Sequence, residues 1–162
     1  MVIFWFRRDL RLDDNHALFK ALKSGYDVLP IFIFDSNITN KLNQNDHRLN
    51  YINNVLDGLN KRLSENKKKI YIYKGNPIEI ISKLIIKLKI KEIYLNKDYE
   101  PYAISRDNQI RELLNNKIEL KTFKDHVVFE ETEITKDDGK PYTIYTPYSK
   151  KWLKKFHETR NI

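Results

Sequence analysis

Short apolar runs alternate with amphipathic segments along most of this chain, and that alternation limits the fold more than any other feature. The runs are rich in β-branched and aromatic residues and are too short for helices. We expect strands at Val2–Phe6, Tyr26–Asp35, Lys69–Tyr73, Lys91–Leu95 and Ile118–Phe123, and helices that carry Ala17–Leu22, Leu49–Leu63, Ile78–Leu88 and the residues after Pro101. Pro30 predicts an edge position or a strand start near Ile31, because it cannot donate to a ladder. The pattern predicts an α/β, Rossmann-like three-layer sandwich of about five parallel strands flanked by helices.

Polar side chains follow the expected strands at the points where the strands end. Three arginines and an aspartate crowd the positions after the first strand, at Arg7, Arg8, Asp9 and Arg11. In open α/β sheets the carboxyl ends of the strands meet at one edge, where ligands bind. The candidate binding residues at this edge are Arg8, Phe34, Asp35, Arg48, Asp98 and Glu100. An alternative stays open, because Arg–Asp pairs can satisfy one another and Glu100 can pair with Arg106 or Arg8.

Composition excludes several classes of site. The 162 residues suffice for one domain with a real core. The chain has no cysteine, and its four histidines lack zinc-like spacing, so we expect no metal site. The net charge of +8 comes from short lysine runs in a chain rich in Lys, Asn and Ile, which favours a solvated surface over a nucleic-acid footprint. No apolar run approaches the ~20 residues of a membrane helix, so we expect a cytoplasmic protein without a membrane partner.

Three strings resemble one family. FWFRRDLRLDDN, at 4–15, closely resembles the opening of DNA photolyases and cryptochromes, except that His16 stands where many members carry proline. NKDYEPYAISRD, at 96–107, resembles the Asp-x-Glu-Pro-Tyr…Arg-Asp segment of the same family. YTIYTPYSKKW, at 142–152, resembles the segment with which members leave their α/β domain. The resemblance therefore covers nearly the whole chain.

The resemblance implies the amino-terminal α/β domain of a deoxyribodipyrimidine photolyase, an enzyme that repairs pyrimidine dimers in DNA with light. We expect a single domain over 1–162, with a core of about 1–128 and a carboxyl-terminal arm of about 129–162. Such a domain would hold a light-harvesting antenna chromophore and contribute no catalytic residue. Its expected partner is the helical FAD-binding domain of the parent enzyme, through which damaged DNA is bound. That domain is expected to be absent here, so the chain alone is expected not to repair DNA.

The candidate residues also bear on the identity of the antenna. Some folate-using members carry an Asn-Glu pair where this chain has Tyr102-Ala103, whereas the Glu-Pro-Tyr form with Arg48 looks more like members that bind a deazaflavin or flavin. We therefore favour a deazaflavin or FMN over folate, and an empty site is the alternative. Phe34 would give the tricyclic ring an apolar wall, and Arg48 with the carboxylates would meet its ring edge and hydroxylated tail.

Other functions stay open. A cryptochrome-type photoreceptor uses the same two domains, and the residues that separate signalling from repair lie outside this chain. A nucleotide-binding or interaction module of similar fold would carry a Gly-rich phosphate loop, but the four glycines of this chain are not grouped. A basic DNA-binding adaptor would need a contiguous Lys/Arg face.

Overall fold

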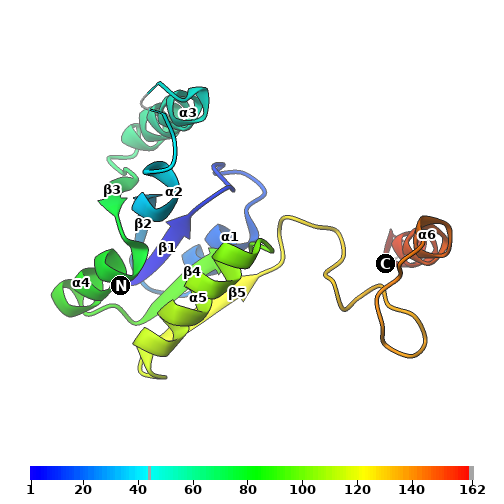
Figure 1. The fold of residues 1–162 in the computed structure, drawn as a ribbon. Helices are drawn as coiled ribbons and strands as arrows, with labels where there is room; N and C mark the ends of the chain where they lie inside the picture. The colour runs from blue at the N-terminus through cyan, green and yellow to red at the C-terminus, as the bar shows by residue number, and fades with distance from the viewer. Residues whose placement is uncertain (44, 161–162) are drawn as a thin grey trace. The chain divides into compact units, whose positions relative to one another are not determined.

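The computed structural model describes residues 1–43 and 45–160, and its first unit, Met1–His126, is built on a five-stranded parallel sheet (Figure 1). The order is β3-β2-β1-β4-β5, with β1 (Val2–Phe6), β2 (Val28–Asp35), β3 (Tyr71–Gly75), β4 (Glu92–Asn96) and β5 (Glu119–Phe123). All of β1 is buried, as expected for a central strand covered on both faces. The order of strands reverses between β1 and β4, so the carboxyl ends of these two strands form the crevice where such sheets bind ligands.

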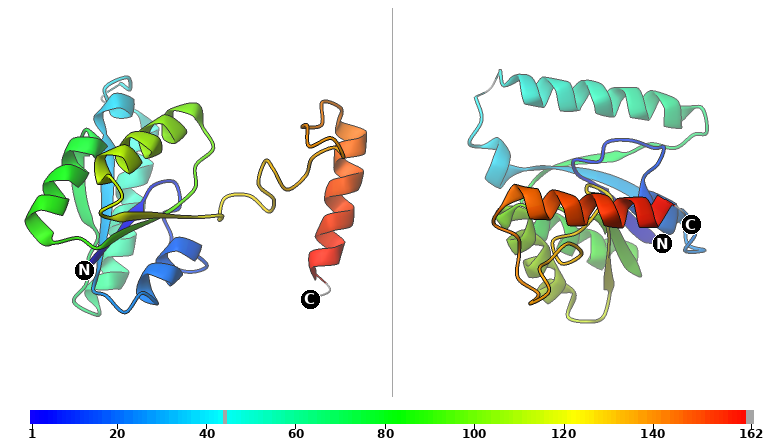
Figure 2. Two further views of the ribbon diagram at one scale, coloured as in Figure 1. Left: turned by 90° about the horizontal axis from the view of Figure 1, so that it is seen from below. Right: turned by 90° about the vertical axis from the view of Figure 1, so that its right-hand side faces the viewer.

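Helices cover both faces of the sheet (Figure 2). On one face, α1 (His16–Leu22) and α3 (His47–Ser64) bury Ala17 and Leu56 against Phe4. On the other face, α4 (Pro77–Leu88) and α5 (Pro101–Leu114) bury Ile81 and Ile110 against the sheet. The expected three-layer α/β sandwich is confirmed.

Local chemistry explains where the helices begin. The side chains of Asn15, Asp46 and Asn76 each accept a hydrogen bond from a backbone N–H in the first turn of α1, α3 and α4, which satisfies a donor that has no partner within the helix. Pro77 and Pro101 open α4 and α5, where a missing N–H costs nothing.

The structure differs from the sequence-based expectation at β2. This strand lies between β1 and β3 and is not an edge, so the edge interpretation of Pro30 is wrong. Pro30 is tolerated because β3 pairs with β2 only from Ile31 onward, which places the missing donor beyond that ladder. The short helix α2 (Ser36–Thr39), directly after β2, was not expected.

The second unit begins at Val127 and contains α6 (Tyr145–Arg160). Its aromatic side chains pack together, with Trp152 in edge contact with Phe129 and stacked on Phe156. Lysines of α6 tie the helix to the preceding loop, since Lys151 Nζ donates to the Thr135 carbonyl at 2.7 Å and Lys155 Nζ to the Glu133 carbonyl at 2.9 Å. Across the described ranges, no helix has the length and apolar character needed to cross a membrane.

A matched pair on α4 tests the layer assignment. Ile81 is fully buried, whereas Ile86 is 82% exposed. Ile81→Ala should lower the free energy of unfolding by about 2–5 kcal/mol, because it opens a cavity in the core, and Ile86→Ala should change it by about 0.5 kcal/mol or less. Urea denaturation followed by circular dichroism measures both. Similar losses at the two positions would contradict the packing of α4 on the sheet.

Candidate functional site

A cavity of about 460 Å³ opens at the carboxyl edge of the sheet, where β1 and β2 end and where α2, α3 and α5 begin. All six candidate residues from the sequence line this edge cavity: Arg8, Phe34, Asp35, Arg48, Asp98 and Glu100. The volume falls within the roughly 300–1,000 Å³ of small-molecule sites. The topology therefore brings together residues that are far apart in the sequence.

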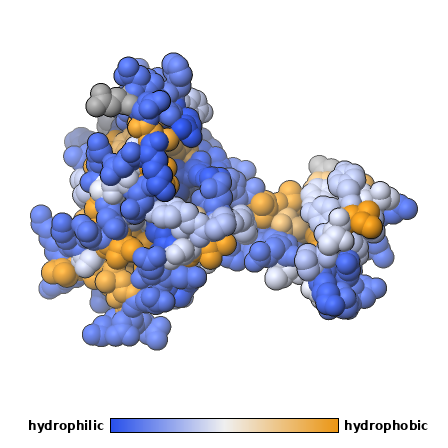
Figure 3. Space-filling view, viewed as in Figure 1, coloured by the Kyte–Doolittle hydropathy of each residue, from blue (hydrophilic) through white to orange (hydrophobic). Residues whose placement is uncertain are grey.

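One side of the edge cavity is apolar. Phe34 lies on Phe32 with ring centroids 5.0 Å apart and the rings nearly perpendicular, and Ile38, Leu49 and Tyr51 extend this surface onto α2 and α3. Figure 3 shows an apolar patch beneath α3 among hydrophilic side chains. A flat aromatic ligand could bury a face against such a wall.

Paired charges line the opposite side. Arg8 Nε lies 3.3 Å from Asp98 Oδ2, and Arg8 Nη2 donates to Glu100 Oε1 at 2.5 Å. The pairing of Glu100 with Arg8, left open as an alternative, is thus present. Arg8 and Glu100 are both largely exposed, so the cluster keeps polar groups in reach of a ligand while its charges largely offset one another.

Asp35 is held by neighbours on two helices, α2 and α5. Its Oδ1 accepts the Asn37 N–H at 2.9 Å and so caps α2, while its Oδ2 accepts the Tyr102 hydroxyl at 2.6 Å. Partial burial of the ring, and then the bond to the Asp35 carboxylate, raise the pKa of Tyr102. Asp35 thus fixes the shape of the edge cavity, with the Tyr102 hydroxyl as its nearest hydrogen-bond donor.

Arg48 lies at the rim, on the first turn of α3, and its side chain is 71% exposed. Its Nε and Nη2 donate to the two oxygens of Asp46 at 2.9 and 2.7 Å. The bond from the Arg48 side chain is the main cause that lowers the pKa of Asp46 to about 2. Among described residues Nη1 of Arg48 has no hydrogen-bond partner, so this nitrogen is available to a ligand.

A buried ion-pair network forms part of the cavity wall. Arg7 Nη1 donates to both carboxylate oxygens of Asp107 at 2.8 Å, and Arg106 Nη2 donates to the same carboxylate at 3.1 Å. Burial lowers the pKa of Arg7, and the Asp107 carboxylate opposes that effect. Trp5, Tyr102 and Arg106 also line the cavity but were not among the candidates. Two of them stand in the string at 96–107, so that string contained the signal.

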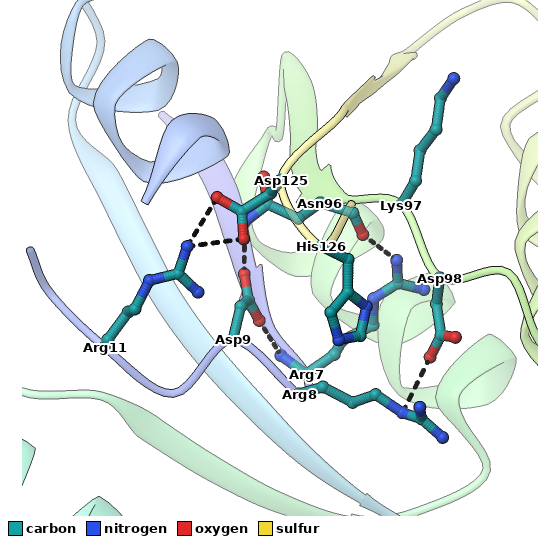
Figure 4. A pocket seen from close by; sticks show the side chains of 9 residues that line it. All are labelled: Arg7, Arg8, Asp9, Arg11, Asn96, Lys97, Asp98, Asp125 and His126. Carbon is teal, nitrogen blue, oxygen red and sulfur yellow. Dashed lines mark hydrogen bonds and ion pairs between the residues drawn. The ribbon is translucent and has the colours of Figure 1, made fainter. Parts of the chain in front are cut away.

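A smaller polar pocket of about 40 Å³ shares Arg7, Arg8 and Asp98 with the edge cavity (Figure 4). Arg11 Nη2 contacts both oxygens of Asp125 at 2.7–2.8 Å, and Asn96 Nδ2 donates to Asp9 Oδ2 at 2.6 Å. This pocket is far too small for a chromophore, and its side chains bind one another. Within residues 1–43 and 45–160, no group of three His, Cys, Asp or Glu side chains is arranged to hold a metal ion.

Comparison with known proteins identifies relatives of this chain. The family model described as DNA photolyase matches residues 2–161. Deoxyribodipyrimidine photo-lyase of Synechococcus sp. is 30% identical over 152 residues, which are 93% of this chain and 31% of the relative. Cryptochrome-1 of Aedes aegypti is 32% identical over 117 residues, 68% of this chain and 22% of the relative.

A solved structure of a photolyase from the archaeon Sulfolobus tokodaii superposes with a TM-score of 0.72 at 33% identity and covers 80% of this chain and 30% of that chain. That protein contains two FAD molecules, which imply a novel light-harvesting cofactor in it. The present chain spans about a third or less of the length of these three proteins.

The ion pair at the rim predicts a pH effect. Because the folded pKa of Asp46, about 2, lies below its ordinary 3.8, the pair stabilises the fold above about pH 4, and its contribution is lost as the pH falls toward 2. Arg48→Ala should return the pKa of Asp46 toward 3.8. Carboxyl ¹³C NMR titration measures this, with Arg62→Ala on the same helix as the control. An unchanged midpoint in Arg48→Ala would mean that the pair does not form.

Proposed function

Because this chain belongs to the DNA photolyase family, we propose that its α/β unit holds a light-harvesting chromophore in the edge cavity. The observation that carries the proposal is the convergence of all six candidate residues on one cavity of about 460 Å³ with an aromatic wall and a polar rim. The parent activity is light-driven repair of pyrimidine dimers in DNA. When bound, the chromophore would absorb light and pass its excitation to FAD.

The chemistry of the lining favours a deazaflavin or FMN. Their tricyclic ring matches the apolar wall made by Phe34, Ile38 and Leu49, and their hydroxylated tail matches the rim with Arg48 and Asp98. The two FAD molecules of the S. tokodaii photolyase give a precedent for a flavin as antenna in a related protein. A pterin ring finds less support, because the Tyr102 hydroxyl already donates to Asp35 and the following residue is Ala103.

The roles of the residues follow from their positions. Phe34 and its apolar neighbours would exclude water from one ring face, and the Arg8 cluster would orient polar atoms at the ring edge. We also propose that the chain comprises an α/β core and an arm after about residue 128, and that its partner is a helical FAD-binding domain that contacts damaged DNA. No residue of this chain breaks or forms a bond in that scheme.

A second candidate function rests on a specific likeness. Cryptochrome-1 of Aedes aegypti is 32% identical over 68% of this chain, so the same cavity would suit a photoreceptor. Repair of ultraviolet-damaged DNA by the full parent protein separates the two functions. A cryptochrome would leave the dimers intact.

Titration with chromophores tests the proposal. Purified protein should bind FMN or a deazaflavin, and folate more weakly or not at all. Arg48→Ala should weaken binding about tenfold or more, because a charge-assisted hydrogen bond contributes roughly 1.5–3 kcal/mol. Quenching of the ligand fluorescence gives the dissociation constant.

The control is Arg62→Ala. Arg62 lies on the same helix but pairs with Asp13 outside the edge cavity, so affinity should not change. Unchanged affinity in both Arg48→Ala and Asp98→Ala would put the ligand elsewhere. Failure of every flavin, deazaflavin and folate to bind would support an empty site.

A further inference from the structure

Trp5 lies at the wall of the edge cavity, and two cations contact its ring. The Cζ atom of Arg106 is 4.9 Å from the centroid of the indole ring, and the Cζ atom of Arg7 is 5.5 Å from it. Both distances fall within the range of a cation–π interaction. Trp5 is 2% exposed and both guanidinium groups are buried, so water screens the charges weakly.

Carboxylates hold both cations in place. Asp107 bonds to Arg7 at 2.8 Å and to Arg106 at 3.1 Å, while Asp35 Oδ2 lies 3.9 Å from Arg106 Nη1. Burying a guanidinium group is costly unless it is paired, and these carboxylates pair both groups beside the ring. The arrangement therefore raises the question of what the cations do to the ring.

An indole ring beside a light-harvesting chromophore can quench the excited state of that chromophore. An excited flavin or deazaflavin takes an electron readily, and tryptophan is among the side chains that give one most easily. One electron would leave the indole ring, enter the excited chromophore and then return to the ring. Both partners would end in their ground states, and the excitation would be lost as heat before it could be passed on.

We propose that Arg7 and Arg106 suppress this loss by making Trp5 a poor electron donor. Removing an electron leaves a positive charge on the indole ring. The two guanidinium groups, 4.9 and 5.5 Å from the ring centroid, oppose that charge, whereas they attract the neutral ring. The Asp107 and Asp35 carboxylates beside them reduce this opposition. The proposal that Arg7 and Arg106 protect the excited state of the chromophore rests on the chromophore site proposed above. The effect of the two cations on the oxidation of the indole ring does not depend on that site.

The fluorescence lifetime of bound FMN tests whether the two arginines protect its excited state. Arg106→Gln should shorten the lifetime about tenfold, since removing a nearby charge speeds electron transfer steeply. Adding Trp5→Phe to Arg106→Gln should restore the lifetime. If Arg106→Gln shortened the lifetime through loss of structure, Trp5→Phe would not restore it. Arg106→Lys, which keeps the charge, should stay near the unaltered protein.

If Arg106→Gln does not fold, Trp5→Phe alone tests the proposal. The fluorescence lifetime of FMN should change little in this variant, because Trp5 already gives few electrons to FMN in the unaltered protein. A large increase in this variant would overturn the proposal, and so would a lifetime in Arg106→Gln that Trp5→Phe does not restore.

A second measurement needs no chromophore. In a Trp152→Phe background Trp5 is the only tryptophan, and azide radicals from pulse radiolysis oxidise it to an indole radical whose absorption is distinct from that of tyrosine radicals. The yield of this radical should rise severalfold in Arg106→Gln. An unchanged yield would refute the effect of the cations, even if FMN binds. A raised yield in a protein that binds no flavin, deazaflavin or folate would instead refute the chromophore site.

Discussion

The buried pair of Arg7 and Asp107 is the interaction on which this edge of the sheet depends. It joins the residue after β1 to α5, and Arg7 Nη2 also donates to the carbonyl of Asn96 at the end of β4. Taking a guanidinium and a carboxylate out of water is expensive, and only close, multiple hydrogen bonds compensate for it. Loss of Asp107 would leave the buried guanidinium groups of Arg7 and Arg106 without the carboxylate that both of them bond to.

The conformation of the loop after β1 depends on this Arg7–Asp107 pair. The Arg7 N–H donates to Asp9 Oδ1 at 2.8 Å, and Asn96 Nδ2 donates to Asp9 Oδ2 at 2.6 Å, so the loop is fixed on both sides of Arg8. Arg8 then projects toward Asp98 and Glu100 at the edge cavity. Because most cavity charges are paired within the protein, the site suits a largely uncharged ring better than a polyphosphate, which would need free cations or a glycine-rich loop.

Much of the fold could be predicted from the sequence, because strand and helix periodicities are local signals. The five strands appear within a few residues of their expected bounds, and the helix starts at Asn15 and Pro77 also rest on local chemistry. That the six candidate residues share one cavity was predictable, since parallel strand ends and the adjoining helix starts meet at one edge of the sheet. Their role in binding stays a prediction. Apart from the Arg8–Glu100 pair, the pairings at this site were not predictable, because Asp107 reaches Arg7 from another element of the fold. Arg48 also meets a local partner, Asp46, that periodicity does not reveal.

Mapping a bound chromophore onto the protein tests the central claim most directly. Backbone amide NMR spectra of ¹⁵N-labelled protein, recorded as FMN is added, identify the residues whose surroundings change. The account predicts shifts at Phe34, Ile38, Leu49 and Glu100, around the edge cavity. Shifts concentrated at Leu12, Phe19 and Leu22, which line a separate groove on α1, would contradict it.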